Sequence, residues 1–121
     1  MDRVVVSLQA ARRTVVVQLT DELDLVTVDA CRARLLAAVL AEPRLGRLVI
    51  DLHEVRFVAV SGIRMLVTVA AALDERRVRT QLIGTSAATR RALRIAGAAD
   101  LLPCFDNVAD ALRATTDRAP A

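Results

Sequence analysis

The chain of 121 residues contains no lysine, tryptophan or tyrosine, and aromatic residues make up only 2% of it. Its core must therefore be built from Val, Leu, Ile and Ala, and it has no row of aromatic side chains on which nucleic-acid bases would stack. One histidine, His53, and two cysteines outside any Cys-x-x-Cys pair do not give the spacing of a metal site. We therefore expect neither a metal nor a cofactor.

Long hydrophobic runs are also missing. Arginine, aspartate or glutamate interrupts each apolar segment well before the ~20 residues that a membrane-spanning helix needs. Met1-Asp2-Arg3 leads directly into a strand pattern, without the apolar region of a signal peptide. These features predict a cytoplasmic protein that does not contact a membrane.

The basic residues are all arginine. There are 17 of them, and the formal net charge is +3, with doublets at Arg12-Arg13, Arg76-Arg77 and Arg90-Arg91. Solvated faces and ion pairs are the simpler interpretation, and a patch for an acidic protein or nucleic acid is the alternative. Because no nucleic-acid-binding motif accompanies the arginines, we expect no nucleic-acid partner.

Hydrophobic periodicity predicts an α/β domain. Val-rich runs at 3–9 and 14–19 indicate a strand hairpin, and the apolar runs at 47–52, 78–83 and 101–105 indicate three more strands, each followed by a helical pattern. The order β-β-α-β-α-β-α-β-α predicts a mixed, mostly parallel sheet with right-handed crossovers. We expect one domain over residues 1–114 and a flexible C-terminal tail over residues 115–121.

Several helix ends carry local signals. The first helix is expected to start near Thr27 and to stop before Pro43, and Ser86 and Gly97 are the expected cap and stop of the third. The second helix, which follows Ser61, is so apolar that it is either deeply packed or presents a patch to a partner. Its two apolar stripes are Ile63, Leu66, Val67, Ala70 and Leu73, and Met65, Val69 and Ala72.

Carboxylates near the predicted strand ends raise the question of catalysis. Such groups bind Mg²⁺ in some α/β folds, and elsewhere they cap helices and pair with arginine. They are Asp21, Glu22, Asp24, Asp51 and Glu54. A phosphorylated Asp51 of the receiver type would need a nearby lysine, which the chain lacks, and His53 has no obvious Ser or Cys partner. The sequence therefore predicts a protein that is not an enzyme.

Ser61 is the most informative single residue, because it stands at the predicted start of an apolar helix. A serine in that place caps free backbone N–H groups. The same N–H groups hold a phosphate, since the helix dipole favours negative charge at that end. Ser61 is therefore a candidate structural cap, a candidate phosphorylation site, or both.

A series of short motifs runs in order along the chain. They are Thr20-Asp21-Glu22-Leu23-Asp24, Leu48-Val49-Ile50-Asp51-Leu52, Val55, Phe57, Ser61-Gly62-Ile63, Leu82-Ile83-Gly84, Ala92-Leu93, Gly97, Leu101-Leu102 and Phe105-Asp106. In this order they resemble the STAS domain family over roughly residues 3–113. The segment before the first helix is similar to the Gly-Glu-Leu-Asp segment of that family, and the central strand and the loop to Ile63 resemble the family's strand and switch loop.

Single-domain STAS proteins of this size resemble anti-sigma factor antagonists, which regulate transcription in stress responses by partner switching. The resemblance implies an anti-sigma factor of the serine kinase type as partner, release of the sigma factor on binding, and Ser61 as the phosphoacceptor. The partner-binding residues it implies are Asp24, Ala59, Val60, Ser61, Gly62, Ile63, Arg64 and Met65. The oligomeric state is left open.

Two positions depart from the family's Asp-Ser-Ser-Gly loop. Ala59 and Val60 stand where the family has aspartate and the first serine, whereas Ser61 and Gly62 are retained. Loss of the acid removes a group that orients or deprotonates the acceptor hydroxyl. The alternative function is therefore a STAS scaffold or sensor module that is not phosphorylated.

The two cysteines, Cys31 and Cys104, lie far apart in the sequence. In a reducing compartment such thiols are small hydrophobic side chains. A redox bridge is the alternative, and it requires Cα atoms within ~7 Å of each other.

Overall fold

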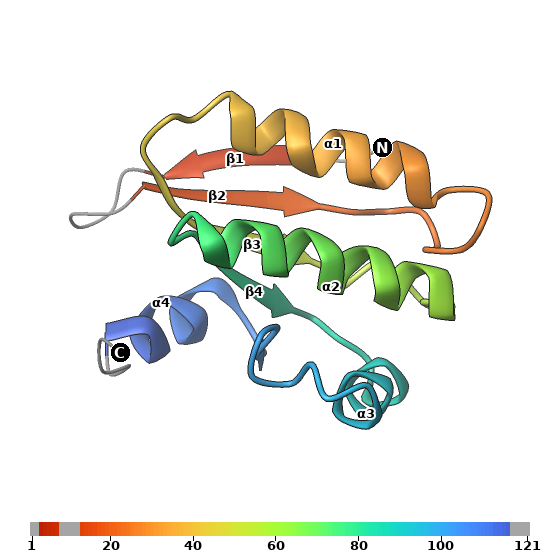
Figure 1. Cartoon of the computed structure of the whole chain (residues 1–121). Coiled ribbons are helices and arrows are strands. Elements are labelled where there is room, and N and C mark those ends of the chain that lie inside the picture. The colour runs from red at the N-terminus through yellow and green to blue at the C-terminus, as the bar shows by residue number, and fades with distance from the viewer. Residues whose placement is uncertain (1–2, 8–12, 117–121) are drawn as a thin grey trace.

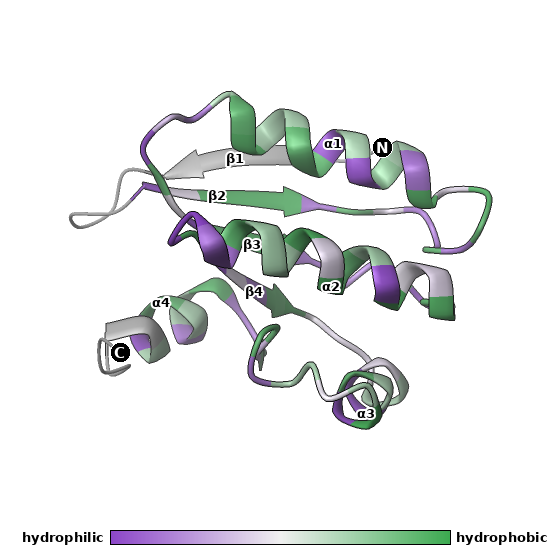
Figure 2. Cartoon of the chain, viewed as in Figure 1, coloured by the Kyte–Doolittle hydropathy of each residue, from purple (hydrophilic) through white to green (hydrophobic). Residues whose placement is uncertain are grey.

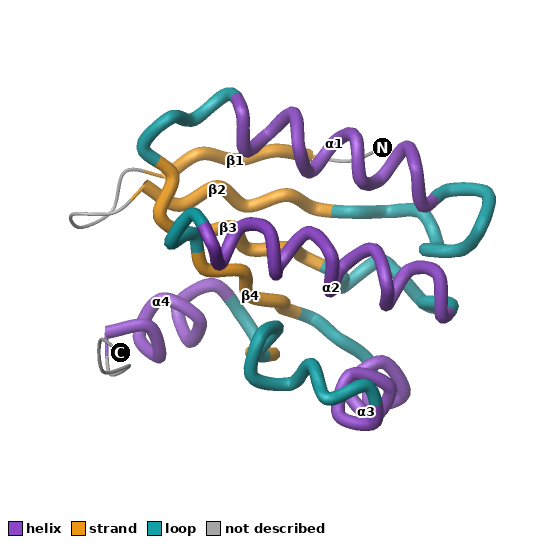
Figure 3. Tube along the Cα trace, viewed as in Figure 1, coloured by secondary structure: helices purple, strands orange, loops and turns teal. Residues whose placement is uncertain are grey.

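The computed structural model describes residues 3–7 and 13–116. Its elements are β1 (Arg3–Ser7), β2 (Arg13–Gln18), α1 (Val28–Leu40), β3 (Leu45–Asp51), α2 (Val60–Glu75), β4 (Arg79–Ile83), α3 (Ala87–Ile95), β5 (Cys104–Phe105) and α4 (Val108–Thr116). This is the order that the sequence predicts (Figure 3). Helix α4 continues past the expected domain boundary at residue 114, and residues 117–121 of the expected tail lie outside the described part.

The strands form one sheet in the order β1-β2-β3-β4-β5. Strand β1 is antiparallel to β2, and the other neighbours are parallel. The mixed, mostly parallel sheet is thus confirmed, with β3 in its centre as its uninterrupted apolar run predicts. The expected hairpin pairs as predicted, and most of its turn lies outside the described residues.

The last strand is shorter than predicted. The run 101–105 contributes only Cys104–Phe105 to the sheet, at the edge beside β4. Pro103 accepts a hydrogen bond from the N–H of Leu82 at 3.0 Å. Because proline has no N–H to donate in return, regular pairing begins only after it.

Helices α1 and α2 pack side by side on one face of the sheet, and α4 lies on the other side (Figure 1). Helix α1 contributes the buried residues Cys31, Leu35 and Val39 to the main hydrophobic core. In α2, most of both predicted stripes is buried, although Val67 is partly and Ala72 largely exposed. Deep packing therefore accounts for most of the apolar character of α2.

A second, smaller cluster joins the opposite face of the sheet to α4. It contains Val49, Ile83 and Ala111, and the Gln81 side chain donates a hydrogen bond to the carbonyl of Ala111 at 2.8 Å. That bond satisfies the NH2 group of the buried amide.

The capping signals of α3 operate where they were expected. The Ser86 hydroxyl accepts the N–H of Thr89 at 3.1 Å, and Gly97 follows α3 with a φ of 73°. Asn107 accepts the N–H of Asp110 at 2.9 Å at the start of α4. These contacts satisfy N–H groups that have no acceptor within a helix.

Hydrophobic residues are not confined to the core. Figure 2 shows them along α1 and α2 and also in the loop between β2 and α1. No helix in the described ranges is both long and apolar enough to cross a membrane.

Candidate functional site

Two loops meet at the carboxyl end of the sheet, where β2 and β3 lead into α1 and α2 (Figure 1). Leu23 and Val58 form an isolated parallel bridge. The N–H of Leu23 donates to the carbonyl of Phe57 at 3.1 Å, and the N–H of Ala59 donates to the carbonyl of Leu23 at 2.7 Å. The two segments therefore leave the sheet side by side, and their geometry is fixed by backbone hydrogen bonds.

Gly62 is needed because of this close approach. A Cβ at position 62 would lie 2.7 Å from the Cβ of Leu23, 2.9 Å from Cγ1 of Val58 and 3.0 Å from the carbonyl oxygen of Leu23. Two of these atoms belong to the backbone or directly adjoin it, so they cannot move aside independently. The glycine allows the first turn of α2 to pack directly on the bridge.

The structure does not support Ser61 as a cap of α2, which was one of the roles that the sequence left open. Helix α2 begins at Val60, its N-cap is Ala59, and no side chain caps this end. Ser61 is therefore inside the first turn. Its residue is partly buried, and its hydroxyl oxygen is covered and has no hydrogen-bond partner. The reason is the hydrogen bond from Ala59 to Leu23, which fixes the N-cap at Ala59, two residues before the serine.

Asp24 organises the loop before α1. Its carboxylate accepts the N–H groups of Val26 at 2.9 Å and Thr27 at 3.1 Å, and its own N–H donates to the Thr27 hydroxyl at 3.1 Å. This arrangement resembles a capping turn, in which a short acidic side chain stabilises backbone N–H groups. Asp24 thus holds the segment that carries Leu23.

Four large hydrophobic side chains are exposed around this meeting point. Leu25 is 82% exposed, Val26 88%, Phe57 54% and Val60 67%. Leu25 and Val26 follow one member of the Leu23–Val58 bridge, and the other two flank the second member. We call these four residues the apolar rim. Exposed apolar residues gathered at one place are typical of a contact surface.

The predicted partner-binding residues fall into two groups. Val60 and Arg64 are exposed, and Asp24, Ala59 and Ser61 are partly buried. Gly62, Ile63 and Met65 are buried and belong to the packing of α2. Sequence reasoning did not assign Leu25, Val26 and Phe57 to this surface, although apolar residues in an acidic loop were a usable signal.

The carboxylates at this end serve local structure. Asp51 accepts the N–H of His53 at 2.9 Å, and its Oδ1 lies 2.7 Å from Nδ1 of the same histidine. Glu54 accepts the side-chain amide of Gln18 at 2.9 Å. Among the described residues, no group of three or more His, Cys, Asp or Glu side chains is placed to hold a metal ion.

Both cysteines are free thiols. Cys31 is buried on the inner face of α1, and Cys104 is partly buried in β5. Burial raises the pKa of the Cys104 thiol, and the charge of Arg90 opposes this by a smaller amount.

A family model for the STAS domain matches residues 6–111. The chain therefore belongs to the STAS domain family, the family that its sequence motifs resemble. No curated protein matches the sequence.

Solved structures agree with this assignment. The unphosphorylated anti-sigma factor antagonist SpoIIAA is 20% identical, with a TM-score of 0.67, and the match covers 96% of this chain and 100% of that one. An anti-sigma factor antagonist from Mycobacterium paratuberculosis is 28% identical, with a TM-score of 0.68 and coverage of 97% and 96%. The murine anion transporter Slc26a9 is 17% identical, with a TM-score of 0.74, over 87% of this chain but 18% of that one.

Proposed function

We propose that this chain is an anti-sigma factor antagonist that binds its anti-sigma factor through the apolar rim and thereby frees the sigma factor. The observation that carries the proposal is the rim itself, because it lies at the start of α2 and each of its four residues is more than half exposed. The likeness to single-domain antagonists over almost the whole of both chains supports it.

The proposal extends to Ser61 as a switch phosphorylated by an anti-sigma factor of the serine kinase type. Rotation about χ1 is the smallest motion that would bring its covered hydroxyl to the surface, because the residue itself is only partly buried. A phosphate there would add about −1.5 to −2 charges beside the rim. That charge would be desolvated and repelled in an apolar contact, so the antagonist would dissociate.

The test pairs the purified protein with the kinase-type anti-sigma factors of its own organism, each expressed singly. Binding is measured by calorimetry, and phosphorylation by intact mass after incubation with ATP. Val60→Asp should weaken binding at least tenfold, which corresponds to about 1.4 kcal/mol. Ser61→Ala should bind as the wild type does and acquire no phosphate, and Ser61→Glu should lose binding.

Leu40→Asp is the matched control, since Leu40 is 73% exposed but lies at the far end of α1 (Figure 1). It places the same charge on an equally exposed apolar residue away from the rim. Binding that is weakened equally by Leu40→Asp and Val60→Asp would contradict docking on the rim. Wild-type affinity in Ser61→Glu would remove the switch and leave the binding intact.

A second candidate function is a STAS scaffold or sensor module that is never phosphorylated. Two observations favour it: Ala59 and Val60 replace the polar loop residues, and the Ser61 hydroxyl is covered. The likeness to the STAS segment of a transporter is compatible with such a module. Intact mass of the protein from its own host, with and without phosphatase treatment, separates the two functions.

A further inference from the structure

Helix α3 carries a basic stripe that the proposed function does not use. Arg90 and Arg94 are four residues apart, so they lie on one side of the helix, next to the buried row of Thr89 and Leu93. Both arginines are exposed. Arg91 lies on a different side of α3, about 100° further round the helix.

The two arginines lack the partners that other arginines of the chain have. Arg13 pairs with Glu42 at 3.1 Å, and Arg113 pairs with Asp110. Neither the Arg90 side chain nor the Arg94 side chain forms a hydrogen bond or ion pair with a described residue. No acidic residue occurs between positions 87 and 99, so α3 offers no neutralising charge of its own.

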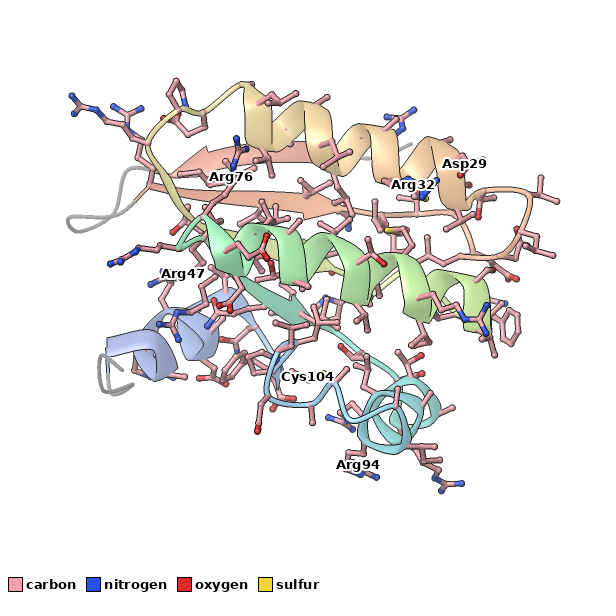
Figure 4. The ribbon with its side chains drawn as sticks, in the orientation of Figure 1. Asp29, Arg32, Arg47, Arg76, Arg94 and Cys104 are labelled. Carbon is pink, nitrogen blue, oxygen red and sulfur yellow. The ribbon has the colours of Figure 1, made fainter. Side chains whose placement is uncertain are left out.

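A hollow of about 160 Å³ lies between these arginines and the segment that leads to β5. Its accessible apolar lining comes from Ala99, which is exposed, and Cys104, which is partly buried, whereas Leu93 and Leu102 are almost completely buried. We call Ala99 and Cys104 the floor of the hollow. Figure 4 labels Arg94 on α3 and Cys104 on β5, the two elements that contribute to the lining of the hollow. The lining residues are Arg90, Leu93, Arg94, Ala99, Leu102 and Cys104, none of them acidic.

We propose that this hollow is a docking site for an acidic peptide segment of a protein partner, separate from the apolar rim. A glutamate or aspartate of the segment bonds to the guanidinium groups of Arg90 and Arg94, which match carboxylates geometrically. A neighbouring aliphatic side chain covers the floor formed by Ala99 and Cys104. The site does not depend on the function proposed for the rim.

Size and composition favour a peptide over other anions. The hollow is smaller than the ~300 Å³ at which sites for small molecules begin, so it has room for one side chain rather than a cofactor. A phosphate backbone would meet the arginines and leave the apolar floor uncovered. Within α3, all of which is described, Ile95 is the only exposed large hydrophobic residue, which is too little for a helix that inserts into a lipid surface.

The probe is a short fluorescein-labelled peptide of alternating glutamate and leucine, and binding is followed by anisotropy at low salt. Arg90→Glu and Arg94→Glu should each weaken binding at least tenfold. Arg91→Glu is the matched control, because it makes the same charge change on the same helix away from the hollow, and it should change affinity less than threefold. Replacing leucine by glutamine in the peptide should also weaken binding.

Cys104 provides a second readout. It lines the hollow, whereas Cys31 is only 4% exposed, so iodoacetamide should modify Cys104 first in the folded protein. Bound peptide should slow that modification several-fold.

Three results would overturn the proposal. The first is equal loss of affinity in Arg91→Glu and Arg90→Glu, which would mean attraction by net charge alone. The second is an unchanged rate of Cys104 modification at saturating peptide. The third is tighter binding, with the same dependence on Arg90 and Arg94, of a single-stranded oligonucleotide or of vesicles containing phosphatidylserine.

Discussion

Two serines near helix starts should respond in opposite ways to replacement by alanine. Ser86 caps α3 through a hydrogen bond of 3.1 Å from the N–H of Thr89. Ser61 lies one residue inside α2, and its hydroxyl oxygen is covered without a partner. We expect Ser86→Ala to lower the free energy of unfolding and Ser61→Ala to raise it.

The magnitudes follow from the two environments. Loss of the cap at Ser86 should cost about 1 kcal/mol. At Ser61, an unsatisfied buried hydroxyl is a penalty of about 1–3 kcal/mol that alanine removes. The oxygen's packing contacts, at about 0.1–0.2 kcal/mol each, offset part of this gain. The net expectation for Ser61→Ala is a stabilisation of about 1 kcal/mol, so the two variants should differ by about 2 kcal/mol.

Urea denaturation at neutral pH, followed by far-ultraviolet circular dichroism, measures both variants against the wild type. Thr68→Ala serves as the control for helix propensity, because Thr68 is an exposed residue of α2. A loss of stability in Ser61→Ala similar to that in Ser86→Ala would refute the reasoning. It would mean that Ser61 caps α2 in solution.

Three further changes test the loops around the site. Gly62→Ala should destabilise the fold by about 1 kcal/mol in urea, because overpacking against Leu23 outweighs the helix propensity gained; equal or greater stability would contradict the close approach. Gly84→Ala should lower the free energy of unfolding for two reasons: the residue has a φ of 69°, and the new Cβ would lie 2.4 Å from the His53 ring. In a double-mutant cycle, His53→Ala should recover the part of this loss that the clash with the ring causes. Zero coupling between the two substitutions would mean that the ring lies elsewhere. The raised pKa of Cys104 stabilises the folded state below the thiol's unfolded pKa, and this contribution is lost as the pH rises through the folded pKa. The chain has no lysine or tyrosine that would titrate between about pH 8 and pH 10. Over this pH range, Cys104→Val should therefore lose less stability than the wild type, and an identical loss in the two proteins would contradict this.

Most of the fold could be predicted because its signals are local. Apolar runs with charged flanks identified the strands, and the uninterrupted run of β3 identified the central one. Ser86 and Gly97 marked the ends of α3 because capping depends on the residues within a single turn. Element order then restricted the topology to a mostly parallel sheet.

The start of α2 could not be predicted in the same way. It depends on the hydrogen bond between Ala59 and Leu23, two residues far apart in the chain. A helix start that is fixed by a tertiary contact leaves no capping signal in the sequence. Ser61 was therefore considered as a cap, whereas the N-cap position of α2 is occupied by Ala59.

The apolar rim was missed for a related reason. Leu25 and Val26 stand between an acidic loop and a predicted helix, so periodicity offers no face to which they belong. Only the bridge between Leu23 and Val58 brings them beside the start of α2. Which residues share a surface is thus decided by pairing between loops.

The same bridge bears on both positions, Ala59 and Val60, at which the chain departs from the family's Asp-Ser-Ser-Gly loop. Ala59 donates its N–H to Leu23, so its position is held by the backbone whatever its side chain is. An aspartate there is not needed to form the fold, and its absence leaves the site's geometry intact while removing an acid beside Ser61. Val60 then adds apolar area at the helix start, where it is 67% exposed. We therefore expect both changes to act on the proposed partner contact rather than on folding, so variants at positions 59 and 60 should alter binding far more than the free energy of unfolding.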